Sequence, residues 1–266
     1  MNRGFSLVEL SIVLVILGLL TGGILAGQSL IRAAEIRSVS TDLQRFNTAI
    51  YTFRDKYFAL PGDMTNATSF WDNADTGTTG GDCAAPLDDA GSGTQTCNGD
   101  GNGHISDLSI ATSYHESLRL WQHLANAGLV EGSYTGTRLG SSNAVTNTVA
   151  GENAPKGRVG TSSYYISYTE ETSGITERFD HPAGHFMLMG GTTTNSWPST
   201  PFLSPEELWN IDTKMDDGHP AYGKVMSRKN GSSVAPNCAT TDASATAEYN
   251  LLSTDKLCIF SVLLGV

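Results

Sequence analysis

The amino-acid sequence predicts an α+β fold, in which one long N-terminal helix packs on a small antiparallel sheet with long, disulfide-closed loops. Three observations carry this prediction. Residues 5–31 form an apolar run, residues 32–59 form an amphipathic stretch, and residues 60–266 hold short strand candidates between segments rich in Gly, Ser and Thr. An apolar segment that continues into an amphipathic one predicts a helix with two environments along its length.

The composition narrows the class of partner. The chain carries 16 Lys+Arg against 27 Asp+Glu, which gives a formal net charge of −11. A nucleic-acid surface needs clustered Lys and Arg to neutralise phosphates, and docking on anionic lipid needs a polybasic patch. The acidic balance argues against both, so we expect no nucleic-acid partner.

The apolar run is the first element of the chain. Between Phe5 and Ile31 the only ionisable residue is Glu9, and the run exceeds the ~20 residues that span a bilayer. A secretory signal peptide, with Arg3 in its basic start and a cleavage site near Ala26-Gly27, is one interpretation. A plain membrane anchor is another. Both leave Glu9 unexplained, because a charge at the bilayer centre costs roughly 2.5–3.5 kcal/mol.

The residues around this carboxylate resemble a known signature. The segment Gly4-Phe5-Ser6-Leu7-Val8-Glu9-Leu10 is similar to the processing and methylation motif of type IV pilins and pseudopilins. The resemblance implies that residues 1–4 are a leader, which prepilin peptidase removes after Gly4, and that the new N-terminal Phe5 becomes methylated. It also implies that residues 5–31 are the transmembrane and filament-core half of a pilin-like helix.

The same resemblance supplies a partner for Glu9. In a filament its carboxylate would meet the charged α-amine of a neighbouring subunit's Phe5. The implied partners are therefore other pilin subunits in a helical homo- or hetero-polymer, prepilin peptidase and the inner-membrane assembly machinery. Many major pilins carry a Pro late in this segment, whereas this chain has Gly22-Gly23, either a point of unwinding or a close-packing position.

Residues 32–59 predict the amphipathic half of the helix. Apolar residues recur at alternating spacings of three and four, which places them on one helical stripe that faces a sheet. Asp42 and the neighbouring arginines are expected on the opposite, solvent or partner side. Pro61 and Gly62 then end the helix. The stripe consists of Ile36, Val39, Leu43, Phe46, Ile50, Phe53 and Tyr57.

The body, residues 60–266, predicts a second helix and a few strands. The spacing of apolar residues indicates a helix over 111–127, with Gly128 as its C-cap. The strand candidates are 163–168, 185–189 and 256–264. Short motifs that begin at Leu60, Cys97, Trp121 and Ile211 also resemble a subgroup of larger pilin-like proteins.

The cysteines predict disulfides. None of the four forms a CxxC pair, which argues against zinc and thioredoxin-like sites. An even number in an exported chain favours two disulfides. Four cysteines allow three pairings, and proximity along the chain favours Cys83–Cys97 and Cys238–Cys258.

One loop resembles a calcium site. Asn98, Asp100 and Asn102 lie at positions 1, 3 and 5 of an EF-hand-like loop, before Gly103. Alternating oxygen side chains around a Gly turn can hold a hard cation. Position 12, normally Glu, is Ser109. The pattern therefore predicts either weak calcium binding or a tight turn without metal.

A second acidic group follows near the end of the chain. Asp212, Asp216 and Asp217 precede Gly218. The resemblance adds that major pseudopilins bind calcium through a late acidic loop, whereas the bare pattern is that of an ordinary turn. Calcium is thus the cofactor that the sequence suggests, with both interpretations open.

No nucleophile–base arrangement occurs in the sequence. His115-Glu116 begins like a zinc-protease motif, but Arg119 stands where the second His belongs. We therefore expect no enzyme but a structural subunit of a type IV pilus or related filament. Two alternatives are a pseudopilin of a type II secretion system and a membrane-tethered periplasmic calcium-binding module that does not polymerise. The expected location is the inner membrane, with the body in the periplasm, and then an extracellular pilus or periplasmic pseudopilus.

Processing of the N-terminus is the first testable prediction. Cleavage after Gly4 and methylation of Phe5 should leave a mature chain that lacks the first four residues and has gained one methyl group. Mass spectrometry of the N-terminal peptide measures both changes. A mature chain that starts near Gly27 would instead establish a signal peptide.

Overall fold

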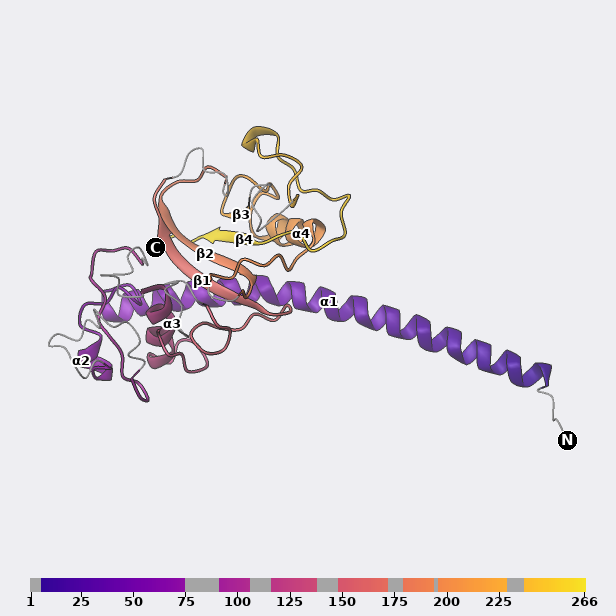
Figure 1. Cartoon of the computed structure of the whole chain (residues 1–266), viewed down its shortest axis with the longest axis horizontal. Helices are drawn as coiled ribbons and strands as arrows, with labels where there is room; N and C mark the ends of the chain where they lie inside the picture. Colours follow the sequence, from indigo (N-terminus) through magenta and orange to yellow (C-terminus); the bar gives the residue numbers. More distant parts are fainter. Residues whose placement is uncertain are drawn as a thin grey trace.

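The computed structural model describes residues 6–74, 91–105, 116–137, 148–171, 179–193, 196–228 and 237–266. Over these residues the protein has the predicted α+β fold. Its dominant element is the helix α1 (Leu7–Tyr57), whose 51 residues extend for about 75 Å. The body gathers around the C-terminal half of α1, while the N-terminal half projects alone (Figure 1).

The two halves of α1 differ in burial as the sequence predicts. Side chains from Leu7 to Ala26 are all exposed, whereas the stripe that begins at Ile36 faces the body. Helix formation continues to Tyr57 and ends at Phe58, which adopts a left-handed conformation with φ 55°. The buried apolar residues of α1 are Ile36, Val39, Leu43, Phe46, Ala49, Ile50 and Phe53.

A four-stranded antiparallel sheet packs against this stripe, with the strand order β1-β2-β4-β3. Its register places Tyr165 opposite Leu188 and Met187 opposite Val262. The strands are β1 (Ser162–Thr169), β2 (Gly184–Gly191), β3 (Val225–Ser227) and β4 (Phe260–Leu263).

The predicted strands at 163–168 and 185–189 are confirmed as β1 and β2. The candidate at 256–264 contains β4, which is shorter than predicted because Leu257 and Cys258 bond instead to Leu203. Three residues of β3 are too few to display an alternating pattern, and the sequence did not predict this strand.

The centre of the core lies where α1, α3 (Glu116–Asn126) and β1 meet. Phe46 of α1 packs edge-on against Trp121 of α3 and Tyr164 of β1, with ring centroids 5.0 and 4.8 Å apart. All three side chains are fully buried. Edge-to-face pairs of this kind add stability beyond the area that they bury.

Helix α3 confirms the predicted C-cap. Gly128 adopts φ +71°, its N–H donates to Ala125 O, and Leu129 N–H donates to Leu124 O. This pair of bonds is a Schellman motif, which satisfies carbonyl groups at the helix end. The predicted start at residue 111 lies outside the described residues.

The helix α4 (Pro205–Met215) was not predicted. Ser204 and Glu207 form a capping box around its first turn, with Pro205 at the first helical position. Glu207 also forms a bidentate ion pair with Arg32 of α1, with Nη2 2.7 Å from Oε2. This ion pair fixes α4 to α1 directly after the apolar run. The remaining short helices are α2 (Thr68–Trp71) and η1 (Ser244–Thr246).

Asp42 corrects the sequence interpretation. It was expected on the solvent or partner side of α1, but it is buried beneath the sheet. The Tyr164 hydroxyl donates to its Oδ2 at 3.3 Å, and Arg45 and Arg158 lie 3.6 Å from its carboxylate oxygens. A buried carboxylate is tolerated here because a donor and two cations surround it.

One predicted disulfide is confirmed. Cys238 and Cys258 are joined across a sequence separation of 20. Cys97 is also disulfide-bonded, while its predicted partner, Cys83, lies outside the described residues. Crosslinks that close loops of this size stabilise a fold by about 3 kcal/mol in the chain-entropy model.

The core generates a direct stability prediction. Phe46→Ala removes a ring that is 1% exposed, so it should lower the free energy of unfolding by about 3–5 kcal/mol. Phe58→Ala is the matched control, because that ring is 92% exposed and its loss should change stability by less than about 0.5 kcal/mol. Urea unfolding of the full chain in detergent measures both. Equal losses would contradict the placement of the core.

Candidate functional site

The first candidate site is the free surface of α1. Among the described residues, α1 is the one helix that is long and apolar enough to cross a membrane. Nothing in the body covers this half of it, as Figure 1 shows. The exposed large apolar residues there are Leu7, Val8, Leu10, Ile12, Val13, Leu14, Val15, Ile16, Leu17, Leu19, Leu20, Ile24, Leu25, Leu30 and Ile31.

Glu9 lies at the very start of this surface. Its carboxylate Oε2 accepts from the Ser6 backbone N–H at 2.8 Å, and the Ser6 hydroxyl accepts from the Glu9 N–H at 3.2 Å. The pair forms a capping box, which satisfies free donors of the helix end. The carboxylate therefore lies beside the Ser6 N–H, at the N-terminal end of α1. Gly4 and Phe5 themselves lie outside the described residues.

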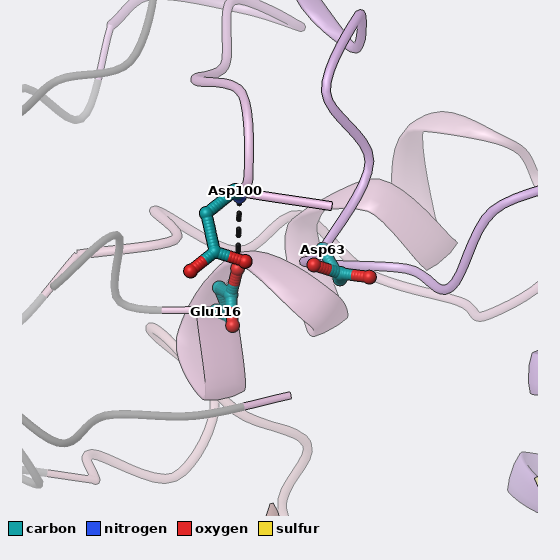
Figure 2. A group of neighbouring side chains, drawn as sticks. All are labelled: Asp63, Asp100 and Glu116. Atoms are coloured by element: carbon teal, nitrogen blue, oxygen red, sulfur yellow. Dashed lines mark hydrogen bonds between the residues drawn. The ribbon is translucent and has the colours of Figure 1, made fainter. Parts of the chain in front are cut away.

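The second candidate site is a group of three carboxylates. Asp63, Asp100 and Glu116 each offer an oxygen, and these oxygens all lie within 4.8 Å of one another. Figure 2 shows Glu116 on the first turn of α3, with Asp63 and Asp100 reaching it from two separate loops. Asp63 is 5% exposed and Glu116 is 1% exposed, while Asp100 faces solvent.

Close backbone packing brings these loops together. Gly62 has φ +91°, and a Cβ there would overlap the carbonyl oxygen of Glu116. A Cβ at Gly99 would overlap the backbone of Gly62 and Asp63. Only glycine fits either position. The motifs that begin at Leu60 and Cys97 therefore form one unit with the start of α3.

A buried histidine holds the same loops. The Gly62 N–H donates to His123 Nδ1 at 2.9 Å, so the ring proton lies on Nε2. Nε2 then donates toward the Thr96 hydroxyl at 3.0 Å or the Cys97 carbonyl at 3.2 Å. Burial, together with the charge of Arg119, lowers the pKa of His123 to about 3. His123 is therefore neutral and acts as a structural hydrogen-bonding group.

The surroundings of Asp63 raise its proton affinity. Burial, and to a smaller extent the neighbouring Asp100, raises the pKa of Asp63 to about 6. The backbone N–H groups of Asn102 and Gly103 oppose this shift by donating to its two oxygens at 3.0 Å each. A cavity of about 360 Å³ opens beside Asp63, with Phe58 and Arg54 among its lining residues.

Only one of the three calcium ligands predicted from the sequence supplies a carboxylate to this site. Asp100 joins the cluster. Asn98 instead accepts a hydrogen bond from the Thr68 N–H at 3.0 Å. Asn102 borders the cluster: its side-chain amide donates to Asp100 Oδ2 at 2.9 Å, while its Oδ1 accepts from the His104 N–H at 2.6 Å. The sequence pattern missed Asp63 and Glu116. The glycines at 62 and 99 were the available signal, because they mark places where backbones meet.

The third candidate site joins Asp212, Asp216 and Asp217, whose oxygens also lie within 4.8 Å of one another. The Tyr249 hydroxyl donates to Asp212 Oδ2 at 2.7 Å. Burial raises the pKa of Asp212 to about 7. Asp217 accepts from the His219 N–H at 2.8 Å, as in an ordinary turn.

Both carboxylate groups have the donor chemistry of a hard divalent cation. Calcium binds through six to eight oxygen ligands, which carboxylates and backbone carbonyls supply. Each group provides three carboxylates that repel one another while ionised, and a cation would relieve that repulsion. Calcium binding stays a prediction at both sites, as does the alternative of turns without metal.

Comparison with known proteins bears on the first site. Residues 1–25 match the family model described as the prokaryotic N-terminal methylation motif. The chain therefore carries the prepilin signature of type IV pilins and pseudopilins, which confirms the resemblance found around Glu9. The motif marks a pilin-like protein that is processed at its N-terminus. No curated protein and no solved structure gives a significant match to the chain.

Asp63 generates a prediction about pH. Because its pKa rises from 3.8 to about 6 on folding, the folded state binds more protons than the unfolded state between those values. Wild-type stability should therefore fall relative to Asp63→Asn as pH rises through this window, by on the order of 1–3 kcal/mol. The hydrogen bond that the variant loses shifts its stability equally at every pH. Urea unfolding from pH 4 to 7 in chelator measures the difference.

Calcium provides the control for this experiment. A bound cation favours the ionised carboxylate, so ~10 mM calcium should raise the melting temperature of wild type at pH 7 and leave Asp63→Asn unchanged. Asp212→Asn tests the other cluster in the same way. If the rise in melting temperature disappears only in Asp212→Asn, the ion binds at that cluster. If calcium raises the melting temperature of no variant and not of wild type, both groups are ordinary turns without metal.

Proposed function

We propose that this protein is a structural subunit of a type IV pilus or related filament. The exposed apolar half of α1, directly after a prepilin motif, is the observation that carries the proposal. The precursor is anchored in the inner membrane with its body in the periplasm. Prepilin peptidase removes residues 1–4, and the assembly machinery transfers α1 from lipid into a helical polymer.

The exposed surface explains why α1 needs one of these two environments. Apolar area in water costs roughly 25 cal/mol per Å², and the large apolar side chains from Leu7 to Ile31 are 50–85% exposed. In the filament, neighbouring helices replace lipid. Gly18, Gly22, Gly23 and Gly27 have nothing within 4 Å of a Cβ position. Small residues at such spacings let helix backbones approach closely.

Glu9 has a specific role in this proposal. Its carboxylate lies beside the Ser6 N–H, and Ser6 follows the position that becomes the N-terminus on cleavage. The charged α-amine of a neighbouring subunit would compensate the carboxylate once lipid is excluded. A buried charge needs such a partner, because an unpaired one costs several kcal/mol.

The acidic groups favour a second candidate, a membrane-tethered calcium-binding module that does not polymerise. Two clusters of three carboxylates lie on the body, outside α1. A pseudopilin of a type II secretion system would have the same long N-terminal helix as the first candidate and would differ in the partners that it meets. Neither alternative, nor the main proposal, gives the chain an enzymatic activity.

Three variants test the role of Glu9. Glu9→Gln keeps an oxygen that can accept from the Ser6 N–H but removes the charge, whereas Ser6→Ala removes the capping hydroxyl and keeps the charge. We expect Glu9→Ala and Glu9→Gln to insert and to be cleaved, but to be lost from filaments, because each interface loses about 3–5 kcal/mol. Ser6→Ala should still assemble. Sheared filament yield, compared with abundance in the membrane fraction, measures the outcome.

Normal incorporation of Glu9→Gln would contradict the charge pairing. Equal loss of Glu9→Gln and Ser6→Ala would assign Glu9 to helix capping alone. If wild type itself forms no filaments while calcium stabilises it, the tethered module becomes the better account.

A further inference from the structure

Two adjacent leucines on the body are exposed to solvent. Leu252 is 98% exposed and Leu251 is 51% exposed. They occupy the tip of a turn in which the Leu251 N–H donates to Tyr249 O at 2.8 Å and the Ser253 N–H donates to Asn250 O at 3.0 Å. Single exposed leucines are ordinary, and this adjacent pair gives the tip of the turn a small apolar surface.

The turn is rigidly held at its base. Cys238–Cys258 crosslinks the two chain segments that lead to it, and the Asn250 N–H donates to Cys238 O at 3.0 Å. Tyr249 is buried and bonds to Asp212 of α4. The leucines are therefore exposed by the architecture of the turn. A preorganised turn loses little conformational freedom when its tip enters another medium.

The turn is also tied to the point where α1 leaves the apolar run. After it, Leu257 and Cys258 donate to Leu203 O at 3.0 and 2.9 Å, next to the start of α4. Glu207, in the first turn of α4, binds Arg32. Figure 1 shows the yellow C-terminal segment beside α4, on the side of the body from which the free half of α1 emerges.

The length of α1 places this side at the membrane surface. Residues 5–31 extend for about 40 Å, at ~1.5 Å per residue. A bilayer is about 30 Å thick in its hydrocarbon core and about 40–45 Å with its headgroups. Arg32, and with it the start of α4, therefore lies at the level of the headgroups while α1 spans the membrane.

We propose that the turn of residues 249–253 inserts Leu251 and Leu252 into the lipid around α1 before assembly. The inference rests on the proposed membrane-anchored precursor. The partner is the interface of the bilayer between headgroups and acyl chains. Arg32 and Lys256 both lie close to Glu207 on this side, and Arg32 also pairs with Glu35, so positive and negative groups are mixed there. Burial of the leucines, and not attraction to anionic headgroups, therefore drives the contact. The body thereby has a second attachment that fixes its orientation on the membrane.

Tryptophan quenching by lipid tests the insertion. The full chain, as wild type, Leu252→Trp or Phe58→Trp, is reconstituted in phosphatidylcholine vesicles with or without bromine on the acyl chains. We expect brominated lipid to reduce the fluorescence of Leu252→Trp beyond that of wild type. Phe58→Trp is the matched control, because residue 58 is 92% exposed and follows the C-terminal end of α1, the end remote from the membrane-spanning half. Melting curves in detergent verify that both variants fold.

Flotation of the same vesicles distinguishes a failure of the proposed membrane anchor from a failure of the proposed insertion of the turn. If wild type does not float with the vesicles, the membrane-anchored precursor and this inference both fail. If it floats but Leu252→Trp is quenched no more than wild type, the inference fails and the proposed function stands. Equal extra quenching of Phe58→Trp would mean that the body adsorbs without orientation, which also overturns the inference.

Discussion

The burial of one stripe of α1 against the sheet and α3 is the interaction on which the rest of the structure depends. Phe46 meets Trp121 and Tyr164 at its centre, and the buried residues continue along α1 to Phe53. Because the helix is continuous, fixing its C-terminal half also fixes the direction of its uncovered N-terminal half. The body thus holds the uncovered, apolar half of α1 in a fixed direction.

This constraint explains which parts of the fold could be predicted. The stripe and strands β1 and β2 have local periodicity, which follows from burial of one face and is visible in a short window of sequence. Helix α4 was missed although Ser204 and Glu207 form a capping box, because its acidic residues were interpreted as a metal or turn pattern. Asp42 was misplaced because the pairing with Tyr164 comes from the tertiary fold.

The cluster of Asp63, Asp100 and Glu116 could also be predicted only in part, because tertiary contacts create it. A spacing rule identified Asp100, since its neighbours lie two residues away, but Asp63 and Glu116 approach it only through folding. Their approach depends on Gly62, whose Cβ would collide with α3, and on His123, which accepts from the Gly62 N–H. Sequence alone could show that these glycines are present, but not which backbones they bring into contact.

The capping box of Glu9 bears on how a filament would gain its next subunit. A lone subunit already gives this carboxylate a donor from its own chain, the Ser6 N–H. A carboxylate accepts from several donors at once, so in the proposed polymer the charged amine of a neighbour would add to the Ser6 N–H and would not displace it. The bond within the subunit would hold the carboxylate in place before the neighbour arrives, and joining the polymer would then cost little conformational entropy at this group.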